Sequence, residues 1–151
     1  MKVNFDAAID VRRNKGAIAV VVRDSNEKPL DWVCKFYDFI IDPLVLESLA
    51  CREATQFAIN RGFDSVIVEG DSLGVINALK ERKDTFIPLS IQAVIHDVKK
   101  LTRSFNSVSF SFVKRSCNHA AHALATKFLS DASFSCNLVA QQIYVLGSLS
   151  V

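Results

Sequence analysis

The chain has 151 residues, of which 50% are hydrophobic and 23% charged, and its formal net charge is only +2. A chain this apolar can bury a core, so the composition excludes an intrinsically disordered protein; five glycines and three prolines exclude a collagen-like or low-complexity one. The length predicts one domain with a core large enough to fold unaided.

The first third of the chain predicts three β-strands. Apolar and polar side chains alternate over residues 3–9, a β-branched run spans 17–22, and a third extended segment spans 30–37. Turn-forming residues over 24–29 separate the last two segments. Because the connections are short, we expect an antiparallel meander.

Helices and strands alternate after the meander. Four helices are expected, over 43–60, around 73–79, from Pro88 to Phe105, and from a cap at Asn118 to Phe128, with strands over 65–68 and 108–112. The order βββαβααβα predicts a single mixed sheet, because strands separated by helices pair in parallel through right-handed crossovers. Ligands on such sheets bind at the carboxyl ends of the strands.

The ends of the chain predict neither secretion nor a membrane anchor. Residues 1–10 lack the apolar run of a signal peptide, and the apolar segment 132–151 is interrupted by Ser, Asn and Gln. We therefore expect one domain over 1–131 and a loosely packed C-terminal tail over 132–151. The four cysteines are far apart, without a C-x-x-C pair, which argues against zinc and redox sites and favours reduced thiols in the cytoplasm or nucleus.

Charge is unevenly distributed along the chain. The segment 80–115 has eight basic and three acidic residues, a net charge of +5, which leaves −3 for the rest. Its basic residues are Lys80, Arg82, Lys83, Lys99, Lys100, Arg103, Lys114 and Arg115. Two interpretations stay open: a solvated helix face, which is the more common case, or a binding surface for a polyanion.

Three acids occupy positions that a mixed sheet would bring together. Asp6 lies inside the first strand on the face opposite Phe5, Glu47 lies early in the first helix, and Asp71 ends the fourth strand. Converging carboxylates repel one another, and divalent cations such as Mg²⁺ relieve that repulsion. Capping explains Asp71 alone, and an exposed helix position explains Glu47 alone. Asp6 is harder to dismiss, because Asp is depleted in strands, and the set favours a metal site.

Five stretches of the sequence match the motifs of a known family in their order and spacing. They cover about residues 3–129: VNFDAA, GAIAVVVRDSNEKPL, LESLACREATQFAINRGF, VIVEGDSLGVINALK and FVKRSCNHAAHALA. The sequence resembles the ribonuclease H type 1 superfamily, specifically the ribonuclease-H-like domain of plant non-LTR retroelements. The resemblance implies an α/β fold with a five-stranded mixed sheet of order 3-2-1-4-5 and helices on both faces.

The resemblance also implies an activity. Asp6, Glu47 and Asp71 match the first three catalytic acids of a two-metal nuclease that uses Mg²⁺ or Mn²⁺. Such an enzyme cleaves the RNA strand of an RNA–DNA hybrid, leaving 5′-phosphate and 3′-hydroxyl ends, and recognises the hybrid by backbone, groove shape and 2′-hydroxyl contacts. The domain is also expected within a larger polypeptide.

The sequence departs from the family at its fourth acid. That position is His122, whose neutral imidazole brings no negative charge and suits Mg²⁺ poorly, so we expect a weakly held second ion and slowed or absent turnover. The Gly that commonly follows the first Asp is Ala7, and the loop after the last strand is too short to present the catalytic His of some members. An H-x-x-H zinc site at His119 and His122 lacks a fourth ligand. We therefore expect His122 to face the carboxylates and His119 to be solvated.

Six residues are predicted to contact nucleic acid. They are Lys99, Lys100, Arg103, Lys114, Arg115 and Asn118, and Asn118 is equally well explained as a helix cap. Three functional hypotheses share the fold: a ribonuclease H-type hydrolase, a nucleic-acid-binding module without catalysis, and a structural or protein-interaction domain.

Overall fold

The computed structural model describes residues 1–80 and 85–131, so the predicted tail over 132–151 lies outside the described residues. The elements are β1 (Lys2–Asp10), β2 (Lys15–Arg23), β3 (Pro29–Asp38), α1 (Pro43–Asn60), β4 (Ser65–Gly70), α2 (Leu73–Leu79), α3 (Leu89–Leu101), β5 (Ser107–Phe112) and α4 (His119–Ser130). Two 3₁₀ turns, η1 (Thr102–Ser104) and η2 (Arg115–Cys117), flank β5. Within the described residues, every helix is too short or too polar to span a membrane.

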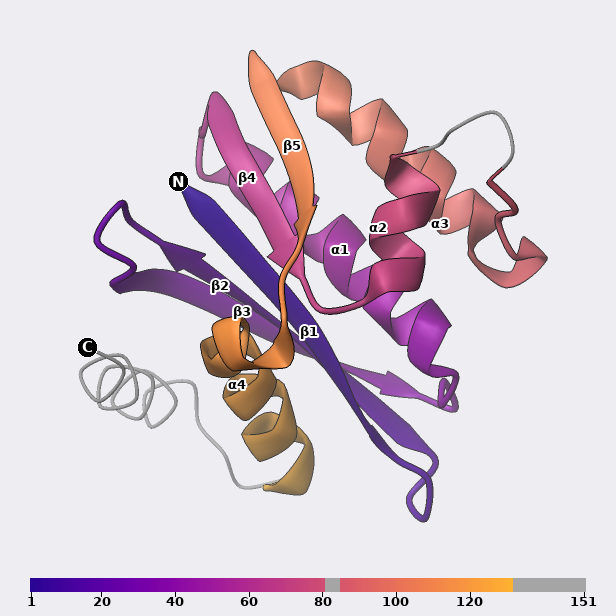
Figure 1. Ribbon diagram of the computed structural model, residues 1–151. Coiled ribbons are helices and arrows are strands. Elements are labelled where there is room, and N and C mark those ends of the chain that lie inside the picture. The colour runs from indigo at the N-terminus through magenta and orange to yellow at the C-terminus, as the bar shows by residue number, and fades with distance from the viewer. Residues whose placement is uncertain (81–84, 132–151) are drawn as a thin grey trace.

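The strands form one five-stranded sheet in the order β3-β2-β1-β4-β5 (Figure 1). The meander β1-β2-β3 is antiparallel, whereas β4 pairs parallel with β1 and β5 parallel with β4. This is the predicted topology, and α1 supplies the crossover that returns the chain to the middle of the sheet. Strand β1 is therefore the central strand, with a partner on each side.

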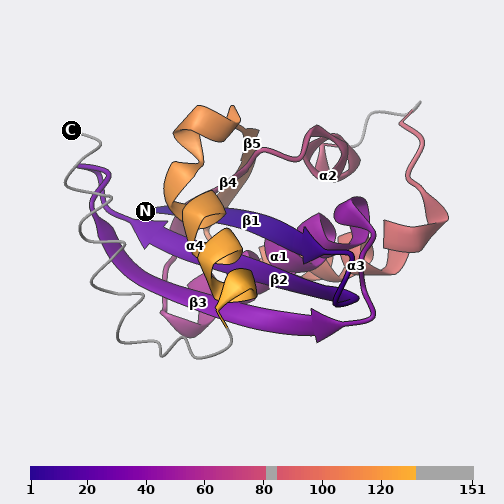
Figure 2. The same cartoon turned by 90° about the horizontal axis from the view of Figure 1, so that it is seen from below.

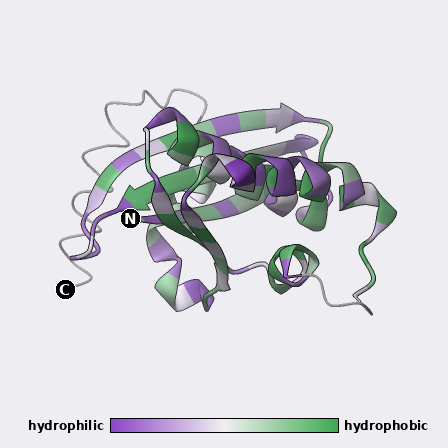
Figure 3. Cartoon of the chain, turned by 90° about the horizontal axis from the view of Figure 1, so that it is seen from above, coloured by the Kyte–Doolittle hydropathy of each residue, from purple (hydrophilic) through white to green (hydrophobic). Residues whose placement is uncertain are grey.

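The two faces of the sheet are covered unequally. Val3 and Phe5 of β1 are buried in a large core with α1, α2 and α3, whereas α4 covers the opposite face over a smaller cluster (Figure 2). Ala19, Ala121 and Ala125 line the smaller cluster, and such small side chains allow α4 to approach the sheet closely. Hydrophobic and hydrophilic residues are interspersed along both the strands and the helices (Figure 3).

The structure differs from the prediction at the end of one helix and in the capping of another. Helix α3 ends at Leu101, and Phe105 lies beyond η1, where it still packs against the large core. Asn118 occupies the N-cap position of α4, as predicted, but its side chain makes no capping hydrogen bond. By contrast, α1 has a well-formed cap, because Asp42 accepts hydrogen bonds from the backbone amides of Leu44 and Val45.

Candidate metal centre

Three carboxylates meet at the carboxyl end of β4. Asp6, Glu47 and Asp71 each offer an oxygen, and these oxygens lie within 4.8 Å of one another. Across residues 1–80 and 85–131, this is the one group of three or more acidic, His or Cys side chains close enough to share an ion. The three acids that the sequence singled out are therefore brought together.

The fold delivers each acid for a definite reason. Asp6 points to the α4 face of β1 because Phe5, its neighbour, is taken by the large core. Glu47 lies just after the capped first turn of α1, and Asp71 follows Gly70, which pairs with Phe5 in the parallel ladder. A Cβ on Gly70 would overlap the Phe5 ring, so only glycine lets β4 end this close to β1.

Burial makes the cluster electrostatically costly. Asp6 is fully buried, and its Oδ1 and the Oε2 of Glu47 are buried atoms without a hydrogen-bond partner. Burial raises the pKa of Glu47 to about 10, with repulsion from Asp6 and Asp71 adding to the effect. Burial likewise raises the pKa of Asp6. Buried carboxylates without partners are costly in a protein unless a proton or a cation neutralises them.

The donor set fits a hard divalent cation. Carboxylate oxygens in this number are typical ligands of Mg²⁺ and Mn²⁺, and two of them have no competing protein donor. The structure does not support the alternative explanations of Glu47 as an exposed helix residue and of Asp71 as a helix cap. Glu47 is half-buried, and the residue at the N-cap position of α2 is Ser72, so Asp71 is not that cap.

His122 lies against the cluster from the α4 side. Its Nδ1 is 2.7 Å from Oδ2 of Asp6, and its side chain keeps 34% of its surface exposed. When Asp6 is ionised it can only accept, so Nδ1–H of His122 donates, and in a neutral imidazole Nε2 is then left without a proton. His119 is exposed, as expected, and no metal group of His119, His122 and Cys117 forms in the described part of the chain.

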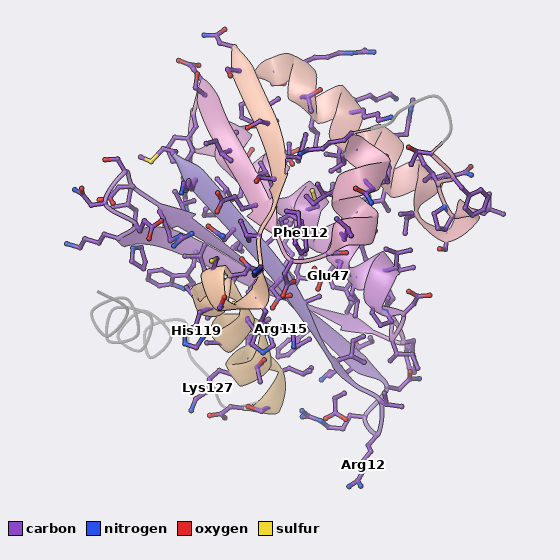
Figure 4. The ribbon with its side chains drawn as sticks, viewed as in Figure 1. Arg12, Glu47, Phe112, Arg115, His119 and Lys127 are labelled. Atoms are coloured by element: carbon purple, nitrogen blue, oxygen red, sulfur yellow. The ribbon has the colours of Figure 1, made fainter. Side chains whose placement is uncertain are left out.

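Arg115, in the turn that precedes α4, contacts the cluster at Asp71. The Nε of Arg115, in η2, donates to Oδ2 of Asp71 at 3.2 Å. Only 8% of the Asp71 side chain is exposed, whereas 70% of Arg115 is. Figure 4 shows Glu47 and Arg115 converging where β1 passes between α1 and the turn before α4. The site thus has a positive charge of its own at its solvent edge.

The predicted basic segment is split between two ends of the sheet. Lys114 and Arg115 follow β5 and lie at the carboxylate end, whereas Lys99, Lys100 and Arg103 lie where α3 leads into the start of β5. Strand β5 has six residues, so this second group is separated from the first by about 20 Å of strand. Lys99, Lys100 and Arg103, the α3 group, therefore lie at the end of the strands opposite the carboxylates.

Asn118 is interior. It is 1% exposed, its Nδ2 donates to the carbonyl of Phe5 at 2.8 Å, and its Oδ1 accepts from Nδ2 of Asn4 at 3.1 Å. Asn4 in turn contacts Arg23 and Glu69, which the sequence analysis did not single out. Their signal was available, because Asn4 alternates with Asp6 on one face of a strand and Glu69 lies two residues before Asp71.

Comparisons with known proteins agree with this architecture. A family model described as reverse transcriptase-like matches residues 4–128. Among solved structures, RNase H1 from Halobacterium salinarum superposes with a TM-score of 0.76 at 23% identity, covering 87% of this chain and 98% of its own. LC11-RNase H1 in complex with an RNA/DNA hybrid gives 0.72 at 15% identity, covering 83% and 94%.

A similar fold occurs as one part of a longer viral chain. The prototype foamy virus protease-reverse transcriptase gives a TM-score of 0.64 at 15% identity, covering 83% of this chain but only 20% of the viral one. No curated protein matches the chain in sequence. The family model spans most of the chain and the sheet has the ribonuclease H topology, so the chain belongs to the reverse transcriptase-like family within the ribonuclease H-like superfamily.

Proposed function

We propose that the chain is a metal-dependent endonuclease that hydrolyses the RNA strand of RNA–DNA hybrids. The observation that carries the proposal is the convergence of Asp6, Glu47 and Asp71 with two buried oxygens that have no partner in the protein. The ribonuclease H fold supports it, since one structural neighbour was solved with an RNA/DNA hybrid. We place the protein in the cytoplasm or nucleus, where its cysteines would stay reduced, and within a larger polypeptide.

The chemistry follows from what the three carboxylates can hold. When bound, Mg²⁺ or Mn²⁺ would supply an activated water and charge neutralisation at the leaving 3′ oxygen, giving 5′-phosphate and 3′-hydroxyl products. The backbone of Asp6 is held in β1, and its Oδ2 is held by the ring of His122. The other oxygen, Oδ1, has no protein partner and is left for an ion. The exposed guanidinium of Arg115 is placed to meet a phosphate of the RNA strand beside Asp71.

A second candidate function rests on His122 and Arg115. The family's fourth acid is replaced by an imidazole, and a guanidinium already pairs with Asp71. Both lower the negative charge available to a second ion, which favours a module that binds hybrid by its backbone and cuts slowly or not at all. A structural or protein-interaction role would leave hybrid both unbound and uncut.

Cleavage of a labelled hybrid separates these functions. With Mg²⁺ or Mn²⁺ the purified protein should cut the RNA strand, and Asp6→Asn should abolish cutting. Asp10→Asn is the matched control, because it removes the same charge from the same strand at a carboxylate that pairs with Arg13 away from the cluster. Gel-shift binding without cutting would assign the non-catalytic module, and neither binding nor cutting would refute both nucleic-acid functions.

A further inference from the structure

A line of buried polar side chains crosses the α4 face of the sheet and ends at His122. We propose that Asn118 is a positioning residue that holds His122 against Asp6, and that Arg23, Glu69 and Asn4 form a relay that fixes the orientation of Asn118. The importance of this device for catalysis rests on the proposed function, whereas its effect on His122 does not.

The ion pair at the outer end of the relay sets its direction. Arg23 is a donor only, and its Nε bonds Oδ1 of Asn4 at 3.0 Å, so the amide nitrogen of Asn4 must face the other way. That nitrogen donates to Oε2 of Glu69 at 3.2 Å and to Oδ1 of Asn118 at 3.1 Å. The Nδ2 of Asn118 is therefore the atom that faces the carbonyl of Phe5. One strong donor and one strong acceptor thus decide both amide orientations.

The inner end of the relay closes a ring of bonds beside the metal site, through Asn118, Phe5, Asp6 and His122. The carbonyl of Phe5, which Asn118 bonds, directly precedes Asp6 in β1. The backbone carbonyl of Asn118 accepts from the backbone N–H of His122 at 3.0 Å, one helical turn into α4. The His122 ring then returns to Oδ2 of Asp6 at 2.7 Å. The first turn of α4 is therefore bonded to two consecutive residues of β1: Asn118 bonds Phe5, and His122 bonds Asp6.

Burial explains why the ring is restrictive. Asn4 and Asn118 are each 1% exposed and Glu69 is 7% exposed, so a broken bond could not be replaced readily by water. Asn118 makes no capping bond to α4 and does not reach the surface. Its side chain joins α4 to the central strand, and that is a positioning role.

The test reads the His122 ring directly, without metal or substrate. Nitrogen-15 NMR of the full chain at a fixed pH of about 8 distinguishes a ring protonated at Nδ1, one protonated at Nε2 and one protonated at both nitrogens. We expect His122 to be protonated at Nδ1, while exposed His96 and His119 average over both forms and serve as internal references. Asn118→Asp replaces the donor to Phe5 by an oxygen and should abolish the Nδ1–H preference of His122 alone. An unchanged His122 signal in folded Asn118→Asp overturns the proposal.

Two further variants keep the test decisive. Thr55→Val removes another buried hydrogen bond, from Thr55 Oγ1 to the carbonyl of Cys51 in α1, and should leave the His122 signal as it is. Arg23→Met breaks the relay at its far end and should weaken the Nδ1–H preference without touching α4. If Asn118→Asp does not fold, Arg23→Met carries the test: a changed His122 signal supports the relay, and an unchanged one overturns it.

Kinetics connect the device to the proposed nuclease. If the chain cuts hybrid, Asn118→Asp should lower kcat by roughly ten- to a hundredfold with little change in KM, because a displaced imidazole alters the reacting site more than substrate binding. In a His122→Ala background the same change should cost nothing further. A protein that cuts no hybrid but shows the NMR behaviour would refute the nuclease and leave the positioning relay intact.

Discussion

At the scale of single residues, the carboxyl group of Glu47 is the most perturbed acid of the site. Its pKa is raised from 4.5 to about 10, so the folded state holds a proton that the unfolded state releases. Stability from this group is therefore fully present below pH 4.5 and is lost progressively as the pH rises toward 10. We expect the Tm of metal-free protein to fall between pH 5 and pH 8, and Glu47→Gln to flatten that decline. Thermal melts in a chelator measure both.

Divalent ions should reverse the same trend. Mg²⁺ binds the ionised acids, so it should raise Tm more at pH 8 than at pH 5, and it should do little for Glu47→Gln. A Tm that is independent of pH in chelator, or equally raised by Mg²⁺ at both pH values, would contradict the proposed burial of charge.

Arg115 competes with cations for Asp71. Arg115→Gln should raise the affinity for Mn²⁺, because the guanidinium no longer neutralises the carboxylate at 3.2 Å. The cost in stability should stay below about 1 kcal/mol, since the arginine is largely exposed and water screens the pair. Calorimetric titration with Mn²⁺ measures the change, and Lys114→Gln, one residue earlier, is the control. A lower affinity in Arg115→Gln would show that the arginine assists ion binding.

The residue at position 122 decides whether the cluster has three or four carboxylates. His122→Asp puts a fourth carboxylate beside buried Asp6, and we expect lower stability in chelator and tighter or additional Mn²⁺ binding. Cleavage of hybrid should then increase if the imidazole limits turnover. An unaltered rate with increased ion binding would mean that His122 is not what limits the site.

At the scale of elements, the end of β4 is the tightest junction. Gly70→Ala directs a methyl group into the fully buried ring of Phe5, and we expect a loss of about 1–3 kcal/mol with a displaced Asp71. Urea unfolding gives the stability, and Mn²⁺ affinity gives the displacement. Gly74→Ala in α2 meets only the flexible tip of Leu44, so it should change both much less. Equal effects of the two substitutions would contradict the close packing at Gly70.

Most elements were predictable because their signals are local. Alternation located β1, helical spacing located α1, and short connections gave the antiparallel meander. The N-cap position of Asn118 was predicted correctly, but its side chain bonds Phe5 instead of the helix, a partner 113 residues away that no local pattern reveals. The predicted α3 was too long because Phe105 continues its apolar pattern. Phe105 packs against the core, but it lies beyond the end of the helix.

At the scale of the whole molecule, cations at the carboxylate end should dominate hybrid binding. Neutralising Lys114 and Arg115 should weaken binding more than neutralising Lys99, Lys100 and Arg103, which lie about 20 Å of strand away. Gel shifts across a salt series measure both variants. A larger loss from the α3 group would place the duplex over that end of the sheet.

The resemblance, which covers most of the chain, predicted the sheet order, whereas the three acids were singled out first by their positions on the predicted strands and helix. The sequence could not predict the relay from Arg23 to Asn118, because four residues from separate elements become partners only when β1, β2 and β4 are aligned. The sequence also could not show that basic residues of 80–115 lie at two opposite ends of β5, because the positions of charges along the chain do not give their positions in space.

The acids of the site and their imidazole partner come from residues 6, 47, 71 and 122, so they draw on both halves of the domain. No fragment that ends before α4 keeps all four, and an opened sheet separates them. Ion occupancy is thus thermodynamically linked to global folding: a cation at a hundred times its Kd would add about 2.7 kcal/mol against unfolding of the entire domain. Substitutions that destabilise the domain enough to populate the unfolded state should consequently lower the apparent ion affinity, even at positions remote from any ligand.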